Sequence, residues 1–340
     1  MSRHTPRPEP RRQRGIALIT AVLVVSLAVI AATSVLDSGH FAIQRASTLQ
    51  DSEKAWGYAT GAEDWVRTIL QRDAKDNRHD ALDEVWAEPQ TLPVENGAIT
   101  GAIVDATSRF NLNNLGVSDS QIPIGTGGEK TTAYLRQARL FAQLIENIEG
   151  APQLISNPQQ LAETIRDWID ADQLPTGGGR EDSDYLILEP PRRAANRPMT
   201  SVTELRTVLD SLYDPRTDDA RKIYQLLLPY VTALPVEGIT PINVNTAEPA
   251  LLMALSPGNS KLAQFAQLRK EKPLKLPGEI TTELEFKPTE ADPSVVSVSS
   301  SLFQLRLQAV VGQGRVALYS LIFRPSQGMP VVLQRSTDSE

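Results

Sequence analysis

Residues 11–36 read RRQRGIALITAVLVVSLAVIAATSVL. Its last 21 residues, Ile16 to Leu36, carry no charge. At about 1.5 Å of rise per residue, a helix of that length spans roughly 30 Å, the thickness of a hydrocarbon core. Five arginines and one glutamate precede it, and such arginines gather on the cytoplasmic side of a membrane helix. We therefore expect residues 16–36 to cross a membrane once, with everything after Leu36 on the far side.

A glycine stands directly before the apolar stretch. An ordinary secretory signal places its small-residue cleavage site after that stretch, where this chain reads Asp37-Ser38-Gly39-His40 and offers a poor site. The arrangement resembles type IV prepilins, which a prepilin peptidase cuts after glycine on the cytoplasmic side. That resemblance implies cleavage between Gly15 and Ile16, with the apolar segment kept as an assembly helix. The alternative is a plain amino-terminal anchor.

The composition argues against several kinds of function. The formal charge is −7, and removing residues 1–15, which carry +4, leaves −11. An acidic body is unfavourable for nucleic-acid binding, which depends on clustered Lys and Arg. Cysteine is absent, so no disulfide and no cysteine-bound metal can form. The three histidines, His4, His40 and His79, are scattered in the first quarter of the chain. A histidine-metal cluster or a Ser/His/Asp arrangement is therefore improbable, and we expect no enzymatic activity.

Helical periodicity continues beyond the apolar stretch and predicts one helix over residues 16–73, with an amphipathic second half. Alternating side chains predict strands over 98–105 and 110–112. Strands are predicted again near the carboxyl end, and a glycine turn at 312–314 joins two of them. Amphipathic helices fill the sequence between the two sets of strands. The predicted later strands are 295–298, 302–311, 315–323 and 331–334, and the predicted helices are 133–149, 158–169, 202–210, 218–228, 247–255 and 261–270.

Strands on both sides of a helical block indicate one antiparallel sheet interrupted by an insertion, an α+β fold. The long amino-terminal helix would then pack on that sheet. The predicted organisation is a leader at 1–15, a helix at 16–73 with its transmembrane part at 16–36, the first part of an α/β head at 74–115, an inserted all-α domain at 116–280, and the carboxy-terminal strands of the head at 281–340.

An acidic loop in the insertion is the richest candidate site. Crowded carboxylates are costly unless a cation compensates them or they spread into water. Calcium takes several oxygen ligands, which acidic loops with glycine turns supply, although the spacing is not that of an EF-hand. The glycines at 177–179 would let the later carboxylates fold back onto the earlier ones. A calcium site and a solvated acidic loop both stay open. The six carboxylates are Asp167, Asp170, Asp172, Glu181, Asp182 and Asp184.

Residues 242–260 resemble the helix-hairpin-helix modules of DNA-uptake proteins, in which a glycine-rich hairpin presents amides to phosphate. Here Ser260 replaces the usual second glycine and Asn259 the apolar residue before it. Basic residues follow within 261–275, but no second basic module accompanies them. The alternative is a packing motif in which Asn243 and Asn245 satisfy backbone groups of the turn.

Six stretches together resemble general secretion pathway protein K, a minor pseudopilin of type II secretion systems, in order along nearly the whole chain. The resemblance implies a pseudopilin fold with a large α-helical insertion that binds calcium. It also implies assembly with minor pseudopilins I and J and the remaining pseudopilus subunits, capping the pseudopilus tip and initiating the filament that exports folded proteins across the outer membrane. The matching stretches are 14–20, 55–63, 108–115, 167–185, 193–197 and 242–247.

The same resemblance implies a single-pass inner-membrane protein with a periplasmic body, cut by the prepilin peptidase and methylated on its new amino terminus. The family's calcium region transfers onto Asp170, Asp172, Glu181 and Asp182, and further onto Asp167 and Asp184. Arg180 stands where the family usually has alanine, which adds a positive charge beside the acidic pair.

Thr20 occupies the fifth position after the expected cut, where most pilins carry glutamate. A buried carboxylate is costly unless paired, and its natural partner is the amino terminus of the neighbouring subunit nearer the tip. A subunit without such a neighbour has no partner for a glutamate, so Thr20 indicates a tip position, and the resembled family characteristically lacks the glutamate. Two other functions stay open: a DNA-binding competence pseudopilin that uses residues 240–275, and a membrane-anchored periplasmic domain that does not assemble.

Overall fold

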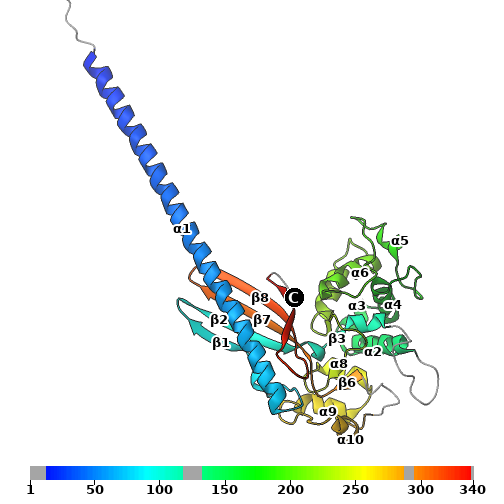
Figure 1. Ribbon diagram of the computed structural model, residues 1–340. Coiled ribbons are helices and arrows are strands. Elements are labelled where there is room, and N and C mark those ends of the chain that lie inside the picture. The colour runs from blue at the N-terminus through cyan, green and yellow to red at the C-terminus, as the bar shows by residue number, and fades with distance from the viewer. Residues whose placement is uncertain (1–12, 118–131, 287–294, 338–340) are drawn as a thin grey trace, which may run out of the picture.

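The computed structural model describes residues 13–117, 132–286 and 295–337, so most of the expected leader lies outside the described residues. Helix α1, Gln13–Asp76, is 64 residues long, and its amino-terminal half projects well beyond the rest of the molecule (Figure 1). Within it an 18-residue window has a mean hydropathy of 2.7, enough for a membrane span. Apolar side chains there are exposed, as Leu23 and Ile30 illustrate at 57% and 63%. The predicted long helix is confirmed.

A five-stranded antiparallel sheet lies under the second half of α1 (Figure 1), in the order β1-β2-β7-β8-β9. The central strands β2, β7 and β8 are long, and β1 and β9 form the edges. Since β2 and β7 are neighbours, the entire segment between them is an insertion into the sheet, as predicted. The strands are β1 Gln90–Val94, β2 Gly97–Asp105, β7 Leu302–Val311, β8 Gly314–Phe323 and β9 Val331–Ser336.

Small side chains bring α1 close to the sheet. Ala55, Ala59 and Ala62 are buried against the strands, and Phe303 and Ile322 are fully buried beneath the helix. The three alanines are three or four residues apart, the spacing of one helix face. Burial of apolar surface on that face, at about 25 cal/mol per Å², holds the helix in place.

The β7–β8 turn fixes the height of α1 on the sheet. Gly312 adopts φ +52°, a conformation that favours glycine. The amide of Gln313 donates to the carboxylate of Asp51 on α1 at 3.0 Å. A Cβ at Gly314 would collide with the backbone of Asp51. The predicted glycine turn is thus confirmed, and it also docks the helix.

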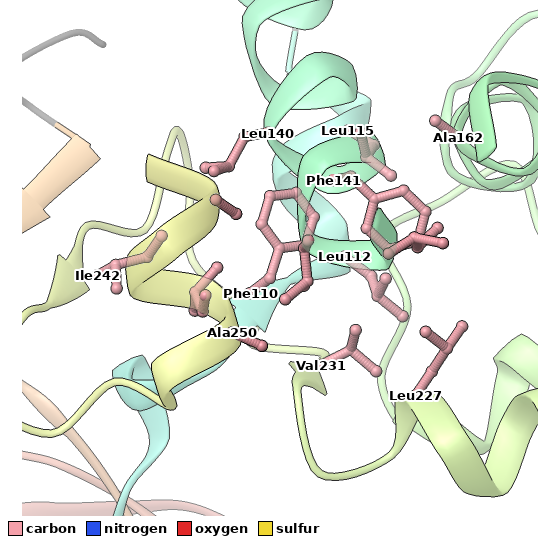
Figure 2. Close-up of a cluster of buried hydrophobic side chains, with 14 of the residues drawn as sticks. Phe110, Leu112, Leu115, Leu140, Phe141, Ala162, Leu227, Val231, Ile242 and Ala250 are labelled. Atoms are coloured by element: carbon pink, nitrogen blue, oxygen red, sulfur yellow. The ribbon is translucent and has the colours of Figure 1, made fainter. Parts of the chain in front are cut away.

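The insertion has its own apolar core, separate from that under α1. Figure 2 shows Phe110 and Phe141 at its centre, with ring centroids 5.4 Å apart. Helix α2 supplies Phe141 and crosses both α4 and α8. The helices after β2 are α2 Ala133–Asn147, α3 Ala151–Leu154, α4 Pro158–Ile169, α5 Asp182–Tyr185, α6 Leu205–Leu212, α7 Asp219–Leu227, α8 Pro249–Leu255, α9 Ser260–Leu268 and α10 Pro277–Glu283. One 3₁₀ turn, η1 Val85–Ala87, precedes the sheet, and the others are η2 Ala106–Ser108, η3 Leu112–Gly116 and η5 Val202–Glu204.

Two short parallel pairings depart from the strands expected in the sequence. β3, Phe110–Asn111, pairs with β4, Val231–Thr232, inside the insertion instead of extending the large sheet. β6, Val296–Ser297, likewise pairs with β5, Ile242–Asn243. Each pairing joins segments more than fifty residues apart, so local alternation could not reveal the partner.

Buried amide side chains tie the insertion to the head. Asn243 is fully buried, and its Nδ2 donates to the backbone carbonyl of Asp80 at 3.0 Å and to Asp105 Oδ2 at 2.9 Å. Asn245 Nδ2 also donates to the Asp80 carbonyl, at 3.3 Å, and it donates to the Leu274 carbonyl at 2.9 Å within the insertion. Buried polar groups need such partners, so these side chains serve the packing role that the sequence left open.

Candidate metal centre

Helix α4 positions the first two carboxylates of the acidic loop. Asn157 caps its amino terminus by accepting from the Gln160 amide at 3.1 Å, and Pro158 occupies the first turn. At the other end Asp167 faces inward with no exposed surface, and Asp170 is the carboxy-terminal cap. Asp167 and Asp170 are three residues apart and therefore share a helix face.

The glycine run folds the loop back along α4. The amide of Gly178 donates to Glu163 Oε2 at 2.7 Å, and the amide of Thr176 donates to Asp167 Oδ1 at 3.0 Å. Gly177 has φ +57°, and Gly179 lies so close to Asp167 that a Cβ there would overlap the carboxylate. The run therefore serves both turn geometry and close approach.

Three carboxylates converge at the end of this loop. Ligand atoms of Asp167, Asp170 and Glu181 all lie within 4.8 Å of one another. Glu181 immediately precedes α5, whose Tyr185 is buried and packs edge-on against Trp168, with ring centroids 5.1 Å apart. This aromatic contact anchors α5 against α4 and so holds Glu181 opposite the aspartates.

The cluster is buried and poorly compensated. Glu181 is only 4% exposed, yet in the described part of the chain neither of its carboxylate oxygens has a hydrogen-bond partner. Asp170 Oδ1 is orphaned in the same way, while its Oδ2 lies 3.6 Å from Arg166. Burying an oxygen without a hydrogen-bond partner costs free energy of folding. Hard oxygen donors of this kind fit a calcium ion, which would satisfy them.

Burial and mutual repulsion perturb the acidity of all three groups. Burial, followed by repulsion from Asp167 and Asp170, raises the pKa of Glu181 to about 7. Burial raises the pKa of Asp167 to about 6, against the hydrogen bonds from Thr176. Burial also raises the pKa of Asp170, with repulsion from Asp172 added. Without a cation the cluster therefore resists full ionisation.

The other three predicted ligands make different contacts. Asp172 is exposed and accepts from the Leu174 amide at 2.8 Å. Asp182 Oδ1 accepts from the Ala194 amide at 2.9 Å. Asp184 Oδ1 lies 2.8 Å from Arg180 Nη1, so this carboxylate engages the arginine beside the acidic pair.

Two residues near the cluster were not among the predicted ligands. Asn196 has φ +47°, its Nδ2 donates to the Asp172 carbonyl at 3.3 Å, and its Oδ1 is buried without a partner in the described ranges. Glu163 holds the returning loop. The signal for Glu163 was its spacing of four residues before Asp167, which puts both on one side of α4.

A second group of carboxylates, Asp73, Asp80 and Glu84, lies where α1 meets the head. Because Arg324 already pairs with two of these carboxylates, the group is a poor candidate for a metal site. Its guanidinium contacts Asp73 and Asp80 at 2.6 Å each, and Glu84 accepts from the indole of Trp86 at 2.7 Å. These acids already have cationic or hydrogen-bonding partners.

In the apolar half of α1, Thr20 forms hydrogen bonds within its own helix. Its hydroxyl donates to the carbonyls of Ile16 and Ala17, at 3.1 and 3.0 Å. The side chain thus needs no group from another subunit. Gly15 and Ile16, the residues of the expected cut, lie in the first turn of α1.

Comparison with known proteins gives consistent matches. A family model described as type II secretion system (T2SS), protein K matches residues 108–236. The type II secretion system protein K of Aeromonas hydrophila is 34% identical and that of Pseudomonas aeruginosa 30%, the alignments covering 98% and 93% of those proteins and 96% of this chain. This chain also resembles a chain in the crystal structure of the GspK-GspI-GspJ complex from enterotoxigenic Escherichia coli, with 28% sequence identity and a TM-score of 0.66. The match covers 87% of this chain and all of that one.

A single apolar amino-terminal helix on an antiparallel sheet, with a helical domain between two strands, defines a pseudopilin that carries an insertion. The chain belongs to the type II secretion system protein K family. It is thus a minor pseudopilin, as predicted, and its apolar helix is consistent with a single-pass membrane anchor. The comparisons give the DNA-binding alternative no support.

Proposed function

We propose that this protein caps the tip of the pseudopilus together with minor pseudopilins I and J. In this role it initiates the filament that exports folded proteins across the outer membrane. The role is structural and not catalytic. The likeness to a complete chain of the solved GspK-GspI-GspJ complex carries the proposal. The helical insertion beside the sheet supports it (Figure 1), because so wide a head is hard to repeat along a slender filament.

Thr20 is the second support for a tip position. A glutamate at this place would need the amino terminus of a subunit above it, whereas the Thr20 hydroxyl is satisfied inside α1. The test is co-expression of the full chain with I and J in membranes, followed by mild detergent extraction. We expect a complex with one copy of each. A complex of I and J that forms equally well without this chain, and never contains it, would contradict the proposal.

Processing follows from the same assignment. The prepilin peptidase would cut between Gly15 and Ile16, the new amine would be methylated, and the body would face the periplasm. Mass spectrometry of the protein from peptidase-competent cells should find Ile16 at the amino terminus, 14 Da heavier if methylated. An intact Met1 start in such cells would exclude this processing.

We further propose that the acidic loop binds calcium. Asp167, Asp170 and Glu181 would hold the ion, because their carboxylates already converge and three of their oxygens lack partners. The other predicted residues lie nearby, Asp172 in the loop after α4 and Asp182 and Asp184 in α5. The ion would supply positive charge where the fold buries negative charge, so its binding energy would add to the stability of the insertion.

Thermal unfolding of the full chain in detergent, with calcium and with a chelator, tests this proposal. We expect the chelator to lower the midpoint of the insertion's transition, and calcium but not magnesium to restore it. Elemental analysis of protein purified without chelator should find calcium. An unchanged midpoint together with no bound metal would mean a solvated acidic loop.

A further inference from the structure

A small apolar cluster and a buried polar network join the insertion to the head. The insertion lies to one side of the sheet (Figure 1), and its apolar core is separate from the core under α1. Between these two cores, Ala106, Leu234 and Leu302 form the small cluster. Apolar contact has no preferred direction, so three such side chains do not by themselves fix the angle between the insertion and the head.

The carboxylate of Asp105 is the centre of the polar network. Asp105 is the last residue of β2 and is only 1% exposed. Its Oδ1 accepts from the amide and from the hydroxyl of Thr107, both at 2.8 Å. Its Oδ2 accepts from Asn243 Nδ2 at 2.9 Å and from the hydroxyls of Thr246 and Ser300.

The donors come from three separate segments of the chain. Thr107 lies in η2, where the chain leaves the sheet. Asn243 is in β5 and Thr246 in the turn that follows, both within the body of the insertion. Ser300 lies between β6 and β7, where the chain returns to the sheet. One carboxylate therefore gathers the entry, the body and the exit of the insertion.

The same network reaches α1. The amide of Ser300 donates to Asp80 Oδ2 at 2.7 Å, and Arg324 Nη2 donates to the Ser300 carbonyl at 2.8 Å. Arg324 Nη1 contacts Asp73 of α1 at 2.6 Å. Hydrogen bonds weaken steeply when they are misaligned, so this path from α1 to the insertion resists rotation of one part against the other.

A carboxylate suits this place because it only accepts. The five donors on Asp105 are one backbone amide, one side-chain amide and three hydroxyls, all neutral. Burying a carboxylate is costly unless its oxygens are hydrogen-bonded, and these donors occupy both. An amide side chain would have one accepting and one donating end, so it could not receive bonds from all three segments at once.

We propose that Asp105 is a positioning residue that holds the insertion at one angle to α1. Without its carboxylate the insertion swings about its entry and exit segments, while both apolar cores stay folded. The inference concerns the free chain and does not depend on the proposed assembly or on calcium binding.

Distances between spin labels in the full chain, in detergent and at fixed calcium, test this proposal. The sequence has no cysteine, so two introduced cysteines are the only labelling sites. Lys54→Cys on α1 with Arg139→Cys on α2 reports the insertion against α1, and Arg139→Cys with Gln264→Cys on α9 reports the insertion alone. All three positions are exposed. Double electron–electron resonance gives the width of each distance distribution.

Two nearly isosteric substitutions should loosen the joint. Asp105→Asn places a donor among donors, and Thr246→Val removes one donor from the insertion's side. We expect each to broaden the distribution between α1 and the insertion at least twofold and to leave that inside the insertion unchanged. Thr164→Val is the matched control, because Thr164 is also buried but its hydroxyl donates within α4, to the Gln160 carbonyl at 2.8 Å. It should change neither distribution.

An unchanged distribution between α1 and the insertion in folded Asp105→Asn would overturn the proposal, as would equal broadening in Thr164→Val. If Asp105→Asn fails to fold, both label pairs broaden and Thr246→Val decides. Broadening of the pair that spans the joint, without broadening inside the insertion, then supports the proposal. An unchanged width for that pair overturns it.

Hydrogen exchange provides a second readout that a purely stabilising role would not produce. In Asp105→Asn, amides around the joint, including those of Thr107, Val244 and Ser300, should exchange at least tenfold faster. Amides in α2 and β8, which belong to the two cores, should keep their wild-type rates. Faster exchange by the same factor in every element would show a loss of global stability and would overturn the positioning role.

Discussion

Gly179 lies against the carboxylate of Asp167 so closely that position 179 has no room for a Cβ atom. The contact depends on the turn that Thr176 and Gly178 make onto α4. It brings the chain back to the helix just before Glu181, so the proposed metal site depends on a residue that would provide no ligand.

Gly179→Ala should therefore disrupt the cluster. The added methyl group must displace Asp167 or the loop, and we expect calcium affinity to fall at least tenfold, measured by calorimetric titration of the full chain. Gly178→Ala is the matched control, because its Cβ would meet its nearest neighbour, Glu163 Oε2, at an ordinary 3.4 Å. Equal losses in both variants would show that general loop stiffness, not the approach to Asp167, matters.

Glu181→Gln should change stability in opposite directions with and without calcium. The amide removes a buried carboxylate that Asp167 and Asp170 repel, so the chelated protein should melt at a higher temperature than wild type at pH 7.5. With saturating calcium the same change removes a ligand, and the variant should melt lower than wild type. Thermal scans with calcium and with chelator measure both.

The control for this change is Asp184→Asn, whose carboxylate is engaged by Arg180. We expect the sign of its effect to be the same in both conditions. If Glu181→Gln lowers the midpoint equally with and without calcium, the side chain has a purely structural role.

The sequence predicted those elements of the fold whose sequence pattern lies within one segment. The apolar run of α1, the alternation of β2 and the glycine turn at 312–314 each lie within one segment, and each predicted element is present. Strand β1 was missed because Pro93 and its exposed neighbours argue against a strand. A local signal did exist: Asn96-Gly97, with Asn96 at φ +59°, is a hairpin turn sequence.

The sequence predicted where the candidate site lies but not which residues form it. Six nearby carboxylates mark the loop, yet only Asp167, Asp170 and Glu181 converge. Asp182 instead meets the amide of Ala194, twelve residues away in a segment without regular structure. Such a contact depends on tertiary packing and has no periodicity to reveal it.

Arg324 should prove essential to the junction between α1 and the head. It contacts Asp73 and Asp80, both at 2.6 Å, and its guanidinium lies 4.6 Å from the ring centroid of Phe303. Arg324→Met keeps the bulk but leaves Asp80, which has no exposed surface, without its cation. Breaking a buried pair in this way costs roughly 3 to 5 kcal/mol.

Urea titration of the full chain in detergent would measure this loss of free energy of unfolding. Arg216→Met is the control, since the pair that Arg216 makes with Asp214 is at the surface and should contribute little. Similar small effects in both variants would mean that water or rearranged side chains compensate the buried acids.

Asp73 should make the stability of this junction depend on pH. Burial, with repulsion from Glu84 and Asp80 added and attraction by Arg324 opposing, raises the pKa of Asp73 from 3.8 to about 7. Between these values the folded protein holds a proton that the unfolded chain has released. Stability therefore falls as pH rises from about 4 to 7, by at most about 1.4 kcal/mol per pH unit for one proton. Asp73→Asn removes the titrating group, so its free energy of unfolding should vary less steeply across that window.

The slope difference between Asp73→Asn and wild type is the quantity to compare, at fixed calcium, because the acidic loop titrates in the same range. Asp64→Asn is the matched control on α1, since Asp64 is 70% exposed and pairs only with Arg67 in the described residues. Its curve should run parallel to wild type. If the Asp73→Asn curve also runs parallel, Asp73 is ionised in the folded protein throughout this range, and Arg324 outweighs the effect of burial.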